Sequence, residues 1–372
     1  LAIVLLELMF FRRLSPRGVG LVALTSALGA IVTFWLLTLP AFDITGLTRE
    51  TDQISRFDYL ATQMEVLWRY IGLFFLVGEQ RLEYAIPVAD GFTAPLTFAL
   101  ALGHLSAITA GFLAWRRAPL VAFGLLFYYL AHAIESSFLP IIDVAFEHRT
   151  YLPNAGLALA TATGLAWLAT RPARWRAGAI GTVAVLILLA GMTWARNSLW
   201  ADQIEFLRAE TRLSPDSQRA WTSLGKELMR KGQFTGALEA LEQAADIAER
   251  AENGQMRPPT ILNMIFALHY TDRNREAVEL ANNTALDGFN QTERAFYFEA
   301  RGRAHFGLGE YNQAREDLTH SARLNPTVNA MSFLAAAEYQ LGNYPRARQL
   351  AGEVLQAAPG NPLARDLMRR MQ

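Results

Sequence analysis

Apolar residues are unevenly placed along this chain, and the pattern changes near Asn197. Before that position long apolar stretches recur, and after it a shorter helical motif recurs instead. A membrane-spanning helix needs roughly 20 mostly apolar residues. Residues 152–170 form a slightly shorter uncharged stretch, and residues 1–11 have the composition of the end of a span. The stretches that fit the full length are residues 18–39, 93–115, 119–139 and 177–194.

This pattern predicts an all-α fold that begins with a polytopic transmembrane helix bundle over residues 1–197, with about six spans or part-spans. Loops rich in arginine are retained on the cytoplasmic side of a membrane. The arginine clusters that follow alternate spans are Arg12, Arg13 and Arg17, then Arg116 and Arg117, then Arg171, Arg174 and Arg176. The outward loops are then residues 40–92 and 140–151, and residues 198–372 are predicted to lie in a bacterial periplasm, beyond the inner membrane.

The longer outward loop contains an apolar segment of its own. Residues 59–77 are apolar on one side and carry Gln63, Glu65 and Arg69 on the other. That pattern favours a helix lying in the membrane interface. A poorly apolar span at this position is the alternative, and it would reverse the orientation of everything that follows.

A motif of the form Gly-x-(Tyr/Phe)-x-x-Ala recurs after Asn197. It occurs at Gly232, Phe234 and Ala237, at Gly309, Tyr311 and Ala314, and at Gly342, Tyr344 and Ala347. The motif resembles the turn of tetratricopeptide repeats, each of which pairs two antiparallel helices within about 34 residues. The residues predicted to pack these helices together are Trp221, Gly225, Phe234, Ala237, Gly302, Tyr311, Ala314, Tyr344 and Ala347.

The resemblance implies a tetratricopeptide α-solenoid over residues 198–372. A degenerate unit over residues 259–286, which keeps only Asn274 and Ala277 of the motif, separates the first repeat from the last two. Such arrays bind extended peptides or a partner helix on a concave face. We therefore expect a protein partner. The alternative is that the repeats pack only on the membrane domain.

The amino-acid composition excludes several kinds of functional site. The 372 residues include no cysteine, which excludes disulfides, thiolate metal sites and cysteine nucleophiles. The formal net charge is zero, so the chain carries no net positive charge that would attract nucleic acid. We therefore expect no nucleic acid as a partner. Leu1 lies inside an apolar run with no methionine before it, so we expect further spans upstream of it.

Ionisable residues gather around the second outward loop. Glu135 precedes it, and Glu147, His148, Arg149 and Tyr151 lie at its end. A charged side chain at a membrane boundary costs free energy unless it is paired with an opposite charge or serves a function. An arginine beside a carboxylate and an imidazole can hold a phosphate group. The residues alone leave two interpretations open, a lipid-phosphate site and a structural ion-pair cluster.

The block Glu-His-Arg-x-Tyr-Leu-Pro over residues 147–153, together with Glu-Ser-Ser-x-x-Pro over residues 135–140, resembles the membrane proteins related to TMTC-type protein O-mannosyltransferases. Residues 59–63 with Val66 and Tyr70, and residues 5–10, carry the same resemblance. That family belongs to the GT-C glycosyltransferases. The resemblance implies transfer of a sugar from a polyprenyl-phosphate donor at the outer membrane face, with membrane lipids and a protein acceptor as partners.

The resemblance covers only the C-terminal portion of such proteins. The acidic catalytic residue of the family usually lies in the first outward loop, which would precede Leu1, so no catalytic residue is assigned within this chain. Residues 78–84 depart from the family pattern of a proline and an aspartate, and Glu79 and Glu83 are the nearest carboxylates. The sequence predicts no metal site, although it leaves a divalent metal cofactor open.

If the protein is an enzyme, Arg149 and His148 are expected on the phosphate side of the donor, because cations stabilise a departing phosphate. Glu147 would orient Arg149, and Glu135 would line the cavity. Glu135 as a helix-end residue facing the outer headgroups is the alternative. The competing function is a non-catalytic, membrane-anchored scaffold whose repeats hold together a larger assembly.

Overall fold

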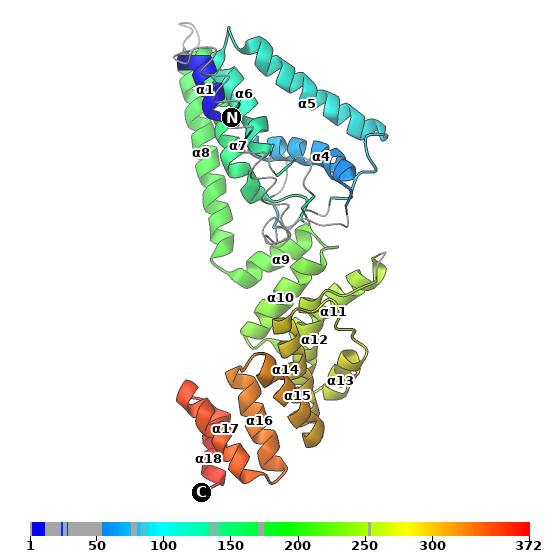
Figure 1. Ribbon diagram of the computed structural model, residues 1–372. Coiled ribbons are helices and arrows are strands. Elements are labelled where there is room, and N and C mark those ends of the chain that lie inside the picture. The colour runs from blue at the N-terminus through cyan, green and yellow to red at the C-terminus, as the bar shows by residue number, and fades with distance from the viewer. Residues whose placement is uncertain are drawn as a thin grey trace. The chain divides into compact units, whose positions relative to one another are not determined.

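The computed structural model describes residues 2–11, 54–75, 80–82, 86–133, 143–169, 175–251 and 254–372, with positions 24, 28, 84, 135–136 and 140–141 between them. The fold is all-α (Figure 1). The chain divides into two compact units, residues 1–198 and 199–372. Several sequence predictions fall outside the described residues, namely most of the span 18–39, the arginines Arg12, Arg13, Arg17, Arg171 and Arg174, and the carboxylates Glu79 and Glu83.

The first unit consists of helices joined by loops. Among the described helices, two are long and apolar enough to cross a membrane, α5 and α8. Within α8 no side chain is buried, so the protein itself does not cover its apolar surface. The helices of this unit are α1 (Ala2–Leu6), η1 (Glu7–Phe11), α4 (Arg56–Phe74), α5 (Pro95–Ala114), α6 (Pro119–His132), η2 (Glu147–Thr150), α7 (Tyr151–Ala169) and α8 (Trp175–Trp200).

The predicted span 119–139 differs from the structure. Helix α6 has 14 residues and ends at His132, and the chain then turns, with Ser136 N donating to His132 O at 2.8 Å. At about 1.5 Å of rise per residue this helix is shorter than the apolar layer of a bilayer. The remaining predicted spans stay predictions, because only α5 and α8 among the described helices have both the length and the composition of a span.

Helix α4 occupies most of the segment predicted as an interfacial helix. It begins at Arg56 because the Ser55 hydroxyl caps it, accepting from Asp58 N at 3.1 Å. Its buried side chains recur every three or four residues and so share one face. That face packs against Tyr84, Ile86, Val144 and Ala145. Its members are Tyr59, Ala61, Thr62, Gln63, Val66, Leu67 and Tyr70.

Helices α6 and α7 approach each other closely at two glycines. A side-chain carbon added at Gly124 would lie 2.3 Å from Gly156 O, and one added at Gly156 would lie 2.4 Å from Gly124 O. Both distances are far below van der Waals contact. Glycine at both positions is therefore what allows this crossing.

The second unit is a tetratricopeptide-type α-solenoid. Helices α10 and α11, α12 and α13, α14 and α15, and α16 and α17 form antiparallel hairpins, with α9 against α10 and α18 against α16 and α17. Each hairpin buries alanines and leucines between its helices. The helices are α9 (Gln203–Leu213), α10 (Gln218–Arg230), α11 (Phe234–Arg250), α12 (Pro258–Tyr270), α13 (Asn274–Asn282), α14 (Gln291–Gly307), α15 (Tyr311–Leu324), α16 (Val328–Gln340), α17 (Tyr344–Ala357) and α18 (Pro362–Arg370).

The turn inside each hairpin has one residue in the left-handed region. In three hairpins it is glycine, at Gly232 (φ 74°), Gly309 (φ 78°) and Gly342 (φ 79°), and in the second it is Asp272 (φ 59°). Only glycine adopts this conformation without a steric penalty. The degenerate repeat therefore keeps the turn of its neighbours, although Asp272 replaces the glycine that favours this turn.

Candidate functional site

Arg149 is the buried charge of the first unit. Its side chain is 7% exposed, and Nε lies 3.5 Å from Oε2 of Glu135, whose side chain is 47% exposed. Nη1 lies 3.5 Å from Val144 O, and the guanidinium lies 5.6 Å from the centroid of the Phe146 ring. A buried guanidinium requires both a counter-charge and hydrogen-bond acceptors. Glu135 supplies the charge, at a distance that leaves the pair loose.

Glu147 does not orient Arg149, contrary to the sequence prediction. Its Oε1 accepts instead from Arg81 N at 2.6 Å and from the Tyr84 hydroxyl at 2.7 Å. Burial and this hydrogen bond raise the pKa of Tyr84, so its phenol stays protonated and donates. Glu147 therefore anchors Arg81 and Tyr84 to the η2 turn, and Glu135 is the carboxylate that pairs with Arg149.

The other predicted members of the corner are exposed. His148 is exposed, and its ring stacks on Phe146 at 5.1 Å between centroids. The Arg149 guanidinium lies over the same Phe146 ring. Tyr151 is 82% exposed at the start of α7. Within the described ranges, no three His, Asp or Glu side chains lie close enough together to hold a metal ion.

Two tyrosines of α4 complete the surroundings of Arg149. The Tyr59 hydroxyl donates to Glu135 O at 2.7 Å, and the Tyr70 hydroxyl accepts from Phe146 N at 2.8 Å. Burial raises the pKa of Tyr59, although Arg149 acts against it, and burial raises the pKa of Tyr70 to about 12. Both phenols are therefore neutral near pH 7. They fix the backbone on either side of the Glu135–Arg149 pair without adding charge.

Buried polar atoms of α4 and of the segment at the end of α6 have no hydrogen-bond partner among the described residues: Gln63 Oε1, His132 Nε2 and Ser136 Oγ. Sequence reasoning noted the segment that contains Gln63 but assigned these three residues no role. Residues 59–63 and 135–140 both belong to the patches that carry the family resemblance, and that was the only signal that could have found Gln63 and Ser136.

In the second unit, the predicted packing residues lie within the hairpins. Ala237, Ala314 and Ala347 are fully buried on the second helices. A side-chain carbon at Gly225 would lie 2.6 Å from Leu241 Cγ, and one at Gly302 would lie 2.8 Å from Leu318 Cγ. Small residues at these points allow the two helices of a hairpin to approach.

The predicted aromatic residues of the repeats contact neighbouring rings or turns. Phe234 stacks on Tyr270 at 4.3 Å, Tyr311 contacts Phe306 at 5.4 Å, and Tyr344 contacts Tyr339 at 5.4 Å. The half-buried Trp221 ring packs beside the first repeat and donates from Nε1 to Pro215 O at 2.8 Å. Phe234 is thus the aromatic residue that joins the first repeat to the second.

The first helices of the hairpins, α10, α12, α14 and α16, pack against one another along the array. A solenoid curves toward the side on which its successive units are closest, so the first helices form its inner surface. At the centre of that surface, Arg303 is buried among aromatic rings contributed by α12 and α16. Arg303 and these rings therefore hold α12, α14 and α16 together.

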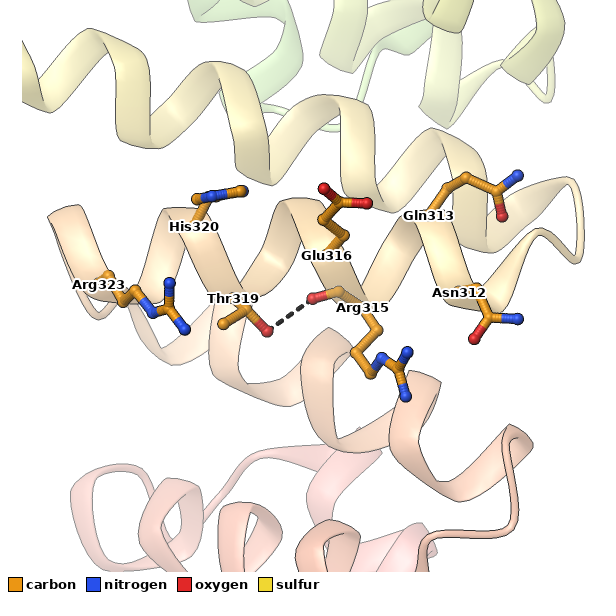
Figure 2. A pocket seen from close by; sticks show the side chains of 7 residues that line it. All are labelled: Asn312, Gln313, Arg315, Glu316, Thr319, His320 and Arg323. Carbon is orange, nitrogen blue, oxygen red and sulfur yellow. Dashed lines mark hydrogen bonds between the residues drawn. The ribbon is translucent and has the colours of Figure 1, made fainter.

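A shallow groove of about 650 Å³ runs along one second helix, α15 (Figure 2). All of its lining residues come from that helix, and most are exposed. A polar groove lined by a single helix has the character of a solvated face. Its lining residues are Asn312, Gln313, Arg315, Glu316, Thr319, His320 and Arg323.

Two stretches of the second unit match family models of the tetratricopeptide repeat, residues 218–250 and residues 299–362. The chain therefore contains tetratricopeptide repeats. The crystal structure of YrrB, a tetratricopeptide protein with an unusual peptide-binding site, is similar at 14% identity and a TM-score of 0.36, over 48% of this chain and 88% of that chain. A MamA double mutant is similar at 13% identity and a TM-score of 0.36, over 49% of this chain and 95% of that chain. No protein of curated function matches the chain.

Proposed function

We propose that this protein is a membrane-anchored scaffold that binds a protein partner on the first helices of its repeats. The observation that carries the proposal is the stacking of α10, α12, α14 and α16 in one continuous row. Tetratricopeptide arrays use such surfaces for peptides and partner helices. The surface offers both exposed polar residues, such as Lys226 and Asn329, and the half-exposed Tyr270 ring.

Site-specific photo-cross-linking in living cells tests this function. A photoreactive amino acid is placed at Lys226 or Asn329 on first helices, and at Glu239 or Arg315 on second helices as matched exposed controls. We expect a discrete cross-linked protein from the first pair and none from the controls. Equal cross-linking from all four positions would contradict a partner site on the first helices.

The membrane anchor and its orientation are part of the proposal. The exposed apolar surface of α8 supports insertion, because a folded protein rarely leaves so large an apolar surface in water. The chain has no cysteine, so single-cysteine variants can be labelled without background. With a membrane-impermeant maleimide on intact cells, Lys226→Cys should be labelled and Arg116→Cys should not. The reverse result would place the repeats in the cytoplasm.

A second candidate function is sugar transfer from a polyprenyl-phosphate donor. The observation that favours it is the burial of the Arg149 side chain, whose nitrogens lie 3.5 Å from Glu135 Oε2 and from Val144 O. In this function the guanidinium binds the donor phosphate, to which it can offer paired N–H donors.

The second candidate is tested by sugar transfer in membranes that contain the protein. Arg149→Ala should abolish transfer from a polyprenyl-phosphate sugar, whereas His148→Ala should leave it largely unchanged, because His148 is exposed while the Arg149 side chain is buried. Unchanged transfer in Arg149→Ala would remove the proposed role of this residue.

A further inference from the structure

We propose that the partner bound on the first helices is an acidic protein segment, and that Lys226 contacts a carboxylate of that segment. This inference rests on the proposed scaffold function and names the chemistry of its partner. The exposed charged residues of α10, α12, α14 and α16 are all cations. They are Lys226, Arg230 and Arg294.

The acidic residues of the first helices do not balance this charge at the surface, because each of them is buried or half-buried. They are Glu227, Glu293, Glu299 and Glu338. Arg230 Nε donates to Glu227 Oε2 at 2.7 Å, so the charge of Arg230 is partly neutralised. Among the described residues, no such ion pair involves Lys226. Lys226 is therefore the cation of α10 that is available to a carboxylate from outside the chain.

Lys226 lies in a row of residues that runs from repeat to repeat along the inner surface. Lys226, Phe266 and Arg303 each lie six positions before the left-handed turn residue of their hairpin, so they occupy equivalent places in three successive repeats. The guanidinium carbon of Arg303 lies 5.4 Å from the centroid of the Phe266 ring. Arg303 is buried, whereas Lys226 is exposed. A partner on this row therefore meets an exposed cation beside a half-buried aromatic ring.

The second helix of the first repeat carries the opposite charge. The exposed charged residues of α11 are Glu239, Asp246, Glu249 and Arg250. Charges on two binding surfaces steer association when they are opposite and oppose it when they are alike. An acidic segment is therefore attracted to α10 and repelled by α11. An anionic membrane is a less suitable occupant, because it binds clusters of several lysines and arginines.

Charge reversal combined with photo-cross-linking in living cells tests the inference. A photoreactive amino acid at Asn329 on α16 captures the partner segment, and mass spectrometry identifies the peptide joined to it. The variants are Lys226→Glu, which reverses the charge, and Lys226→Arg, which keeps it. Arg315→Glu is the matched control, because Arg315 is an exposed cation on the second helix α15.

We expect the captured peptide to carry a net negative charge. Its yield should be about tenfold lower in Lys226→Glu and little changed in Lys226→Arg and in Arg315→Glu. Equal far-ultraviolet circular dichroism of the purified variants shows that the substitutions leave the fold intact.

An unchanged yield in Lys226→Glu, or a captured peptide without net negative charge, would overturn the inference and leave the scaffold function standing. A loss of equal size in Arg315→Glu would also overturn it, because the effect would then not depend on the first helices. Absence of any captured protein at Asn329, or capture of lipid alone, would reject the scaffold function together with the inference.

Discussion

The guanidinium carbon of Arg303 lies 4.5 Å from the centroid of the Phe333 ring. The same group lies 4.9 Å from the Tyr270 ring and 5.4 Å from the Phe266 ring, and Nη2 donates to the Tyr270 hydroxyl at 2.7 Å. Arg303 belongs to α14, whereas its neighbours belong to α12 and α16. One cation therefore joins the first helices of three successive repeats.

Loss of this cation should destabilise the repeats. Arg303 also pairs with Glu299 at 3.5 Å, with both side chains at most 6% exposed. Arg303→Met would leave Glu299 buried without its cation, and we expect a loss of about 3 kcal/mol in the free energy of unfolding. Urea unfolding of the full chain in detergent, monitored by circular dichroism, measures this free energy.

Arg315→Met, on the exposed face of α15, is the control. It should change the free energy of unfolding by less than about 0.5 kcal/mol. Equal effects of the two substitutions would show that the contacts of Arg303 with Glu299 and with the rings do not stabilise the repeats.

The Asp272 turn offers a stabilising substitution. Its φ of 59° is one that glycine adopts at the equivalent turns of the other hairpins. Asp272→Gly should raise the free energy of unfolding by about 1 kcal/mol, because the left-handed conformation is strained for other residues. Gly309→Asp should lower it by a similar amount. The midpoints of thermal unfolding check both, and a destabilised Asp272→Gly would mean that contacts of the Asp272 carboxylate outweigh the strain.

The degenerate repeat should also be sensitive to acid through His269. Its Nδ1 lies 2.7 Å from Asn274 Oδ1, and burial lowers its pKa, with Arg303 acting in the same direction and Asp272 against it. The unfolded chain then binds the proton more readily than the folded one. The contribution of neutral His269 to the free energy of unfolding is complete above the pKa of histidine in the unfolded chain, about 6.5. It is lost as the pH falls below that value.

Urea unfolding at a series of pH values between about 8 and 5 measures this dependence. His269→Gln keeps a donor for Asn274 Oδ1 but does not titrate, so its stability should fall less steeply with acid than that of the unaltered protein. His320→Gln, an exposed substitution on α15, serves as the control and should leave the slope unchanged. Identical slopes in the unaltered protein and in His269→Gln would exclude His269 as the titrating group.

The repeats could be predicted from sequence because their signals are local. Gly232, Phe234 and Ala237 lie within six residues, and together they define a turn and the helix that begins at Phe234. The end of α6 at His132 could not be predicted in the same way, because Ala133 and Ile134 continue the apolar run beyond it, and Phe138 and Leu139 resume that run after three polar residues.

The partner of Arg149 was wrongly predicted for a related reason. Glu147 is close in sequence, and its carboxylate was the natural choice, yet in the folded chain it accepts from Arg81 N and Tyr84. The Gln63 contact to Val144 joins residues 81 positions apart. Pairings across such separations depend on the packing of α4, which no local pattern reveals.

The crossing of α6 and α7 gives a direct test of packing in the first unit. Gly124→Ala would place its new carbon against Gly156 O, which is backbone and cannot move away as a side chain can. Overpacking of this kind costs about 1–3 kcal/mol, so we expect a lower midpoint of thermal unfolding for the full chain in detergent. Gly164 lies in α7, the helix that contains Gly156. A side-chain carbon added at Gly164 would meet no atom within 4 Å. The control Gly164→Ala should be neutral or slightly stabilising, because alanine favours a helix over glycine. If Gly124→Ala unfolded at the same temperature as Gly164→Ala, the two helices could not be in contact at these glycines.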